Sequence, residues 1–181
     1  MPGDVLRFAL EAVSRGEGSF HVLDRLPAAI YMTNAEGLVT YYNDACIAFA
    51  GRRPVVSQDS WCVAWKLYTE QGEYLPHDQC PMAVAIREKR AIRGVRAVAE
   101  RPDGSYVEFQ PCPTPLLSED GKLLGAINLI LDVSGPGRAE SLRARAAKCR
   151  RFVNLMPGQQ EALLSMAADY DETACRIERQ H

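Results

Sequence analysis

The sequence predicts an α+β fold, in which short helices cross a five-stranded antiparallel sheet and a helical hairpin follows. Three short turns carry this prediction, at residues 34–37, 101–104 and 118–121. Each turn ends in a glycine preceded by Glu or Asp, and each separates two apolar or alternating runs. A glycine that accepts positive φ lets a short loop reverse the direction of a strand. The turns therefore predict antiparallel strand pairs.

The predicted strands flank these turns. The first pair covers residues 28–33 and 38–42, and the second pair covers residues 95–100 and 106–110. A fifth strand follows the third turn and covers residues 123–132. Apolar residues alternate or run together in all five segments, as is typical of strands.

Residues 43–90 separate the two strand pairs and predict short helices and loops. Asn43 is a suitable N-cap for a first helix, and Gly51 is a natural stop. We expect a second helix from about Asp78 to Arg90, because its apolar residues recur at helical spacing. Pro81 falls in the first turn of that helix, where proline is tolerated.

Two helical appendages are expected to flank the sheet domain. Residues 1–18 predict an N-terminal helix that starts after Asp4. Residues 135–181 predict a linker and two helices, over residues 138–156 and 157–179. The first of these two is basic and the second is acidic, and each carries an apolar stripe. Folding back between them would bury both stripes and align opposite charges, which favours a helical hairpin.

The order of several motifs resembles the PAS domain family, sensory modules of signalling proteins, over residues 20–134. Residues 31–45 resemble the first hairpin and helix cap of that family, and residues 121–126 with 132–134 resemble its last strand. We therefore assign residues 19–134 to a PAS domain. Three further segments resemble a subgroup common in bacterial sensor kinases and regulators: residues 65–68, 76–83 and 100–105.

The resemblance implies a cavity between sheet and helices, which in some members holds a cofactor or metabolite. Trp61 and Trp65, one helical turn apart, would form an aromatic wall there or would simply fill the core. Asn128 is expected to point away from this cavity, because it alternates with two apolar residues. The expected lining residues are Met32, Tyr41, Ile47, Phe49, Trp61, Trp65, Met82, Ile86, Val95, Val107, Phe109, Ile127 and Leu129.

Neither of the two coloured cofactors of this family is expected. Haem would need an axial histidine inside the second crossing helix, but His77 lies just outside it and His21 precedes the first strand. Light-sensing flavin would need a reactive cysteine in an Asn-Cys-Arg-Phe-type motif, and the residues around Cys62 differ from it. Gln110 and Asn128 are nevertheless strand residues that could bond a ring.

No motif for catalysis or for a metal is found. The chain has no glycine-rich phosphate loop, nucleophile elbow or HExxH motif, and no kinase, cyclase or helix-turn-helix signature. We therefore expect no enzyme activity and no output domain. Asp132 ends the last predicted strand and marks the expected signal exit. The Gly-Pro-Gly run at residues 135–137 disfavours a continuous helix beyond it.

Composition narrows the expected partners and location. The 181 residues carry 21 basic and 23 acidic side chains, a net charge of −2, so no strong field favours nucleic acid or an anionic membrane. The six cysteines include no CxxC pair and are expected to be free thiols. Without a signal peptide or an apolar run of about 20 residues, a cytoplasmic location is expected.

Three functions follow as expectations. The first is a stand-alone bacterial sensory protein that binds a small molecule noncovalently, or a partner protein, and forms a homodimer. The alternative is a structural dimerisation module whose core is filled and holds no ligand. A third possibility is a thiol redox sensor that uses Cys62 or Cys80. An inaccessible thiol without a lowered pKa would count against this third function.

Overall fold

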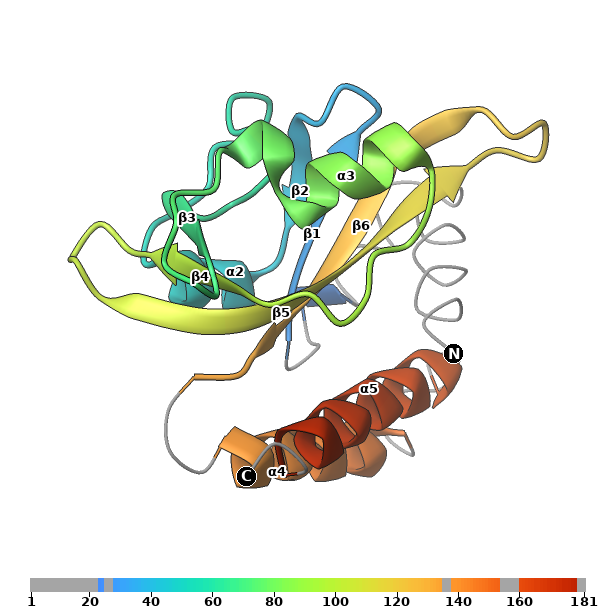
Figure 1. Cartoon of the computed structure of the whole chain (residues 1–181). Helices are drawn as coiled ribbons and strands as arrows, with labels where there is room; N and C mark the ends of the chain where they lie inside the picture. The colour runs from blue at the N-terminus through green and yellow to red at the C-terminus, as the bar shows by residue number, and fades with distance from the viewer. Residues whose placement is uncertain (1–22, 25–27, 135–137, 154–159, 179–181) are drawn as a thin grey trace. The chain divides into compact units, whose positions relative to one another are not determined.

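The computed structural model describes residues 23–24, 28–134, 138–153 and 160–178. The chain divides into two compact units, and each is presented by itself. One unit, residues 28–132, contains the sheet and is called the sheet unit here; the other contains the two C-terminal helices (Figure 1). The N-terminal helix expected within residues 1–18 lies outside the described residues.

The sheet unit confirms the α+β prediction with one strand more than expected. Its strands are all antiparallel, in the order β2-β1-β6-β5-β4-β3. The additional strand, β3, lies in the segment that was predicted to be helices and loops. Its four residues are too few to show a clear alternation. The strands are β1 (Ala29–Asn34), β2 (Val39–Tyr42), β3 (Lys66–Thr69), β4 (Ala97–Glu100), β5 (Tyr106–Leu117) and β6 (Leu123–Asp132).

All three predicted turns are confirmed. The backbone N–H of Gly37, Gly104 and Gly121 donates to the carbonyl three residues earlier, at 3.1, 2.9 and 2.9 Å. All three glycines have positive φ. At Gly37 the absence of a side chain is needed for a second reason, because a Cβ would collide with the indole ring of Trp61.

Strand β5 is longer than expected and continues through Pro111, Pro113 and Pro115. The carbonyl of Pro113 accepts a bond from the Ile92 N–H at 3.1 Å, so this edge of β5 faces away from β6. Pro111 and Pro115 lie two residues before and after Pro113, so their backbone nitrogens face the same edge of β5. Strand β4 pairs with β5 only as far as Phe109. The missing proline N–H groups therefore fall where β5 has no neighbouring strand, which a sheet tolerates.

Two short helices and one face of the sheet form the core. Helix α2 (Asp44–Ala50) and helix α3 (Pro81–Glu88) contribute the buried residues Phe49 and Met82 to it. The rings of Phe49 and Phe109 meet edge to face with centroids 4.9 Å apart, joining α2 to β5. Residues 51–65, which have no regular structure, cover part of the same face through Cys62, Val63 and Ala64.

The predicted ends of the two helices are confirmed in part. Helix α2 follows Asn43 and ends at Gly51, which adopts the left-handed conformation. Asn43 does not cap α2 with its side chain; instead its Oδ1 accepts from Ile30 N at 3.0 Å, and its Nδ2 donates to Ala28 O at 2.7 Å. Helix α3 begins later than expected, because the 3₁₀ helix η2 (His77–Gln79) occupies the expected first turn.

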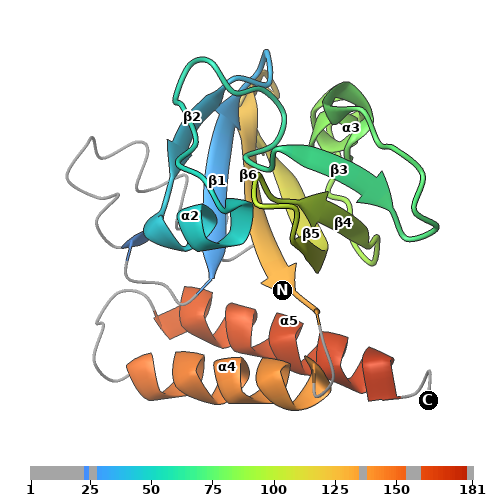
Figure 2. The ribbon, with the colours of Figure 1, turned by 90° about the vertical axis from the view of Figure 1, so that its left-hand side faces the viewer.

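The predicted helical hairpin is confirmed in the second unit. Helices α4 (Arg138–Phe152) and α5 (Gln160–Glu178) run side by side in opposite directions (Figure 2). Arg143 donates two hydrogen bonds to Glu178, at 3.1 and 2.7 Å, and Arg150 pairs with Asp171. The expected alignment of basic and acidic side chains is thus present.

Candidate functional site

A small polar cluster lies inside the otherwise apolar core of the sheet unit. The Tyr31 hydroxyl donates to the Trp61 carbonyl at 3.0 Å and accepts from Asn128 Nδ2 at 3.0 Å. Asn128 Oδ1 accepts from the Cys112 N–H at 2.9 Å. Tyr31 and Asn128 face each other across β1 and β6 and are both buried. We call these two side chains with the Trp61 carbonyl the core polar cluster.

Two thiols, Cys62 and Cys80, adjoin this cluster, and a third, Cys46, interacts with Cys62. Cys80 Sγ lies 3.8 Å from the Trp61 carbonyl, which also accepts from Tyr31. Cys46 Sγ donates to the Ile30 carbonyl at 3.2 Å, and Cys62 is close enough to Tyr31 to interact with it electrostatically. All three cysteines are buried. The core therefore has a polar end made of one phenol, one amide and polarizable thiols.

Burial controls the protonation of this site. Burial, with the nearby Cys62 and Cys80 thiols, raises the pKa of Tyr31 well above its usual value. Burial also raises the pKa of Cys62, and it raises the pKa of Cys46 and Cys80 to about 12. The phenol and thiols are therefore neutral near pH 7. Buried neutral thiols are poor nucleophiles, which counts against the expected thiol redox sensor.

The structure places six of the thirteen expected lining residues in the core. They come from both helices, from the loop that covers the sheet and from β5, and Trp61 is only partly buried among them. Whether they contact a ligand stays a prediction. The six are Phe49, Trp61, Met82, Ile86, Val107 and Phe109.

Four expected lining residues lie on the other face of the sheet. Tyr41, Met32 and Ile127 are neighbours across β2, β1 and β6, and Leu129 lies two residues along from Ile127. The expected orientation of these strand residues was wrong, because the apolar residues of β1, β2 and β6 were assumed to alternate into the core. Asn128 instead points into the core, where the Tyr31 hydroxyl provides its partner.

Three further expected lining residues also lie outside the core cluster. Ile47 is half-buried, while the neighbouring Cys46 and Phe49 point inward. Trp65 is 43% exposed and carries the Lys66 ammonium 4.3 Å above its ring. Val95 is 42% exposed. The expected aromatic wall does not form, because residues 61–65 are not helical and only Trp61 packs against the core.

The residues considered for cofactors have other roles in the structure. His77 Nε2 lies 3.0 Å from the Ala64 carbonyl, so this ring joins η2 to the loop before β3. His21 lies outside the described residues. Asn128 donates to Tyr31 and accepts from the Cys112 N–H, and Gln110 lies on the opposite sheet face, paired with Leu131. The two amides thus cannot bond one ring together.

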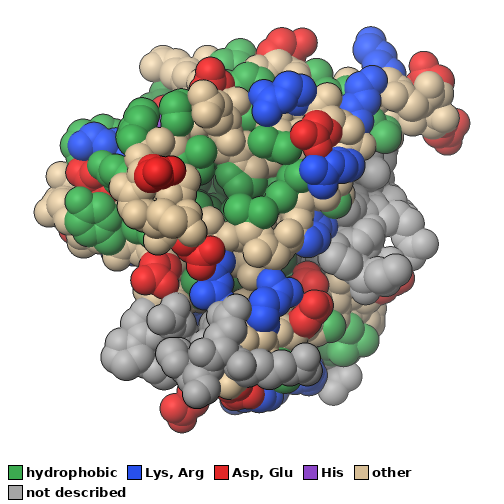
Figure 3. All heavy atoms as spheres, in the orientation of Figure 1, with side chains coloured by type: hydrophobic (Ala, Val, Ile, Leu, Met, Phe, Trp, Pro, Cys, Tyr) green, Lys and Arg blue, Asp and Glu red, His purple; other side chains and the backbone are tan. Residues whose placement is uncertain are grey.

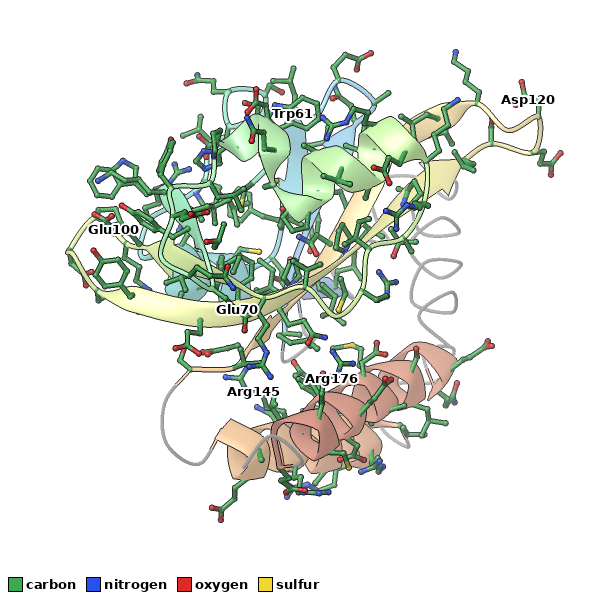
Figure 4. The ribbon with its side chains drawn as sticks, in the orientation of Figure 1. Trp61, Glu70, Glu100, Asp120, Arg145 and Arg176 are labelled. Carbon is green, nitrogen blue, oxygen red and sulfur yellow. The ribbon has the colours of Figure 1, made fainter. Side chains whose placement is uncertain are left out.

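An exposed aromatic surface was missed in the sequence. Tyr74 and Tyr106 are 60% and 61% exposed, and both rings meet Tyr68 edge to face, at 6.0 and 6.2 Å. The Tyr68 hydroxyl donates to Glu100 at 2.6 Å, which raises the pKa of Tyr68 to about 12 and lowers that of Glu100 (Figure 4). We call Tyr68, Tyr74 and Tyr106 the aromatic surface. Strand β3, which was not predicted, brings the Tyr68 ring against the other two.

Within the described parts of the chain, no group of three or more His, Cys, Asp or Glu side chains is placed to hold a metal ion. Likewise, none of the helices within the described ranges is both long and apolar enough to cross a membrane.

Comparisons with known proteins identify the fold. No protein-family model and no curated protein matches the chain. Among solved structures, the RsLOV d2 variant is similar with a TM-score of 0.59 and 14% identity, over 88% of this chain and 92% of that one. The Rhodobacter sphaeroides LOV protein is similar with a TM-score of 0.56 and 13% identity, over 88% of this chain and 92% of that one. The PAS domain of the fruit-fly ELK potassium channel is similar with a TM-score of 0.50 and 12% identity, over 66% of this chain and 100% of that one.

Identities this low establish the fold and nothing further. The strand order, the short helices on one sheet face and these structural similarities agree. The protein therefore contains a domain with the PAS fold, as the motifs indicated.

Proposed function

We propose that this protein is a bacterial sensory or signal-transduction module that binds a small molecule noncovalently in the core of its PAS-fold unit. It passes the signal to a partner protein and has no enzyme activity. The PAS fold supports this class of function, because the structurally similar proteins include LOV proteins and a channel PAS domain.

The observation that carries the proposal is the core polar cluster. Ligand pockets are mostly apolar and contain a few polar groups that fix the ligand's orientation. Tyr31, Asn128 and the Trp61 carbonyl provide such groups next to apolar side chains. A ligand hydroxyl or carbonyl can replace one of these internal bonds at small net cost, because the bond is exchanged and not lost.

Transmission requires that the ligand prefers one of two states of the protein. The covering segment suits this role, since residues 51–65 lack regular structure and hold the core mainly through Trp61, Cys62 and Val63. We propose that the ligand shifts this segment and that Asp132, the last residue of β6, marks the exit of the signal. The C-terminal hairpin, residues 138–178, would then provide an interaction surface.

We also propose a homodimer in the cytoplasm, without nucleic acid or membrane as partner and without a permanently bound coloured cofactor.

The aromatic surface supports a second candidate, a protein-interaction module with a filled core. Tyrosine and tryptophan are enriched at the energetic centres of interfaces. Trp65, Tyr74 and Tyr106 expose such rings beside the short edge strand β3. In this candidate, the core polar cluster only stabilises the sheet.

Native mass spectrometry and an absorption spectrum of freshly purified protein separate the two candidates. A noncovalent small-molecule adduct that disappears on denaturation would support the sensor. An adduct-free protein, together with a partner captured only when Tyr74 and Tyr106 are intact, would support the interaction module. Visible absorption would contradict the proposed lack of a coloured cofactor.

A further inference from the structure

A second concave site lies outside the core, beside α3. It is a groove of about 590 Å³ between the end of β3, helix α3 and the segment that leads into β4. Figure 3 shows a hollow in this face, edged by hydrophobic side chains with basic side chains nearby. Its volume falls within the range of small-molecule pockets, about 300–1,000 Å³.

The wall opposite α3 is held in place by backbone bonds. Lys89 adopts a left-handed conformation with φ of 52° and ends α3, so the chain turns back along the helix. Ile92 N donates to the Pro113 carbonyl at 3.1 Å and ties the segment to β5. This contact uses the edge of β5 that its prolines leave without a strand. This bond fixes the segment that forms one wall of the groove.

Apolar side chains form much of the groove's lining. Leu75 comes from the loop after β3, Val84 from α3, and Ile92 and Val95 from the segment before β4. Val95 is 42% exposed, although it was expected inside the core. An exposed valine in a concave surface gains stability when an apolar ligand covers it.

Positive charge dominates the charged part of the lining. Arg90, Arg93 and Arg96 line the groove, and Glu70 is the single acidic side chain among the described residues of the lining. Arg96 lies 3.7 Å from Glu70, which Figure 4 labels, and Arg90 pairs with Glu88 at 2.6 Å. Two of the three guanidinium groups thus have a carboxylate nearby.

Arg93 has no such carboxylate among the described residues. Its Nη1 donates to the carbonyls of Ile92 and Pro113, at 2.8 and 2.9 Å, and its Nη2 donates to Thr114 Oγ1 at 2.6 Å. Its Nε is buried without a hydrogen-bond partner within the described parts of the chain. These neutral acceptors fix the guanidinium but leave its charge uncompensated. An anion in the groove would supply that compensation.

We propose that this groove binds a small organic carboxylate with an apolar body. The carboxylate would lie toward the arginines, since guanidinium and carboxylate match in charge and in hydrogen-bonding geometry. The apolar body would cover Val84 and Val95. The site is separate from the core polar cluster, so it does not depend on whether the core holds a ligand.

Calorimetric titration of the full chain with sodium octanoate tests the proposal, with octan-1-ol as the uncharged probe. We expect saturable octanoate binding, at least about tenfold tighter than octanol binding, because a charge-assisted hydrogen bond is stronger than a neutral one. No octanoate binding, or equal affinity for the two probes, would overturn the proposal.

Variants locate the binding. Arg90→Gln should weaken octanoate binding about fivefold or more, and Glu70→Gln should strengthen it two- to threefold by removing the single carboxylate of the lining. Arg87→Gln is the matched control, because Arg87 lies on α3 but does not line the groove. Arg93→Gln should weaken binding most, with thermal unfolding to verify its fold. If that variant does not fold, the octanoate affinities of Arg90→Gln and Glu70→Gln test the proposal. Equal affinities of the wild type, Arg90→Gln and Glu70→Gln would contradict the assignment.

Discussion

Asn128 shows how one side chain changes the interpretation of a strand. In sequence it interrupts the apolar run of residues 123–131, and a polar residue within such a run is commonly assigned to the outer face. In the structure it is buried and bonds both the Tyr31 hydroxyl and the Cys112 N–H. A buried amide is tolerated when its groups are bonded. Its partner is 97 residues away, and therefore no local pattern could reveal the pair.

Replacement of Asn128 should destabilise the protein. Asn128→Leu removes the partner of a buried N–H and one partner of the Tyr31 hydroxyl, so the free energy of unfolding should fall by about 1–3 kcal/mol. Tyr31→Phe, which keeps the ring, is the milder control. Urea unfolding of both single variants and the double variant measures their coupling, expected at about 0.5–3 kcal/mol. Strictly additive effects would show that the two side chains do not interact.

The buried thiols predict a loss of stability at alkaline pH. Cys46 and Cys80 have their pKa raised from 9.0 to about 12 in the folded protein. Between these values the unfolded chain has lost thiol protons that the folded chain retains, so the free energy of unfolding falls as pH rises. This contribution is fully present below pH 9.0 and decreases toward pH 12. Cys46→Ala and Cys80→Ala should each flatten the dependence, as measured by urea unfolding from pH 8 to pH 11. A dependence identical to that of the wild type in both variants would contradict this origin.

At the scale of elements, the positions of turns and helix ends were predictable because they depend on local chemistry. The glycine turns, the start of α2 after Asn43 and its stop at Gly51 all follow from one or two residues. The elements that sequence reasoning missed depend on distant partners. Strand β3 exists through its pairing with β4, and β5 extends through three prolines only because that edge has no neighbouring strand.

The close approach of β1 and β6 predicts a strict requirement at Gly125. Gly125 lies opposite Asn34, and a Cβ there would collide with the backbone carbonyl of Thr33. Because backbone cannot move aside easily, Gly125→Ala should lower the free energy of unfolding by about 1–3 kcal/mol. Gly121→Ala is the control, since the space around Gly121 is open and its cost should be nearer about 1 kcal/mol. Thermal unfolding that ranks the two variants in the opposite order would contradict this register.

Charge pairing in the hairpin predicts a rescue. Arg143→Glu places two acidic groups together and should lower the melting temperature at low salt. Adding Glu178→Arg restores an opposite pair and should recover part of the loss. Both effects should be small and should shrink in high salt, because the Arg143 and Glu178 side chains are about half exposed. A double variant no more stable than Arg143→Glu would argue against the observed alignment.

At the scale of the whole molecule, the fold class was accessible from the sequence, whereas the candidate site was accessible only in part. Fold class depends on the order of turns and strands, which the three glycine turns establish. The site depends on which face each strand residue occupies, and Met32, Ile127 and Leu129 were assigned to the face opposite the one they occupy beside Tyr31 and Asn128. The groove beside α3 has no signature in sequence, because it is built from segments at residues 69–96 that only the fold brings together.

Ligand binding at the core polar cluster is tested by a thermal-shift screen of a metabolite library against the wild type and Asn128→Leu. At least one compound should raise the melting temperature of the wild type and leave that of the variant unchanged. A compound that binds the groove beside α3 would instead raise the melting temperature of both proteins, but not that of Arg90→Gln. The sensory claim would be contradicted if no compound stabilised the wild type, or if every stabilising compound acted equally on Asn128→Leu.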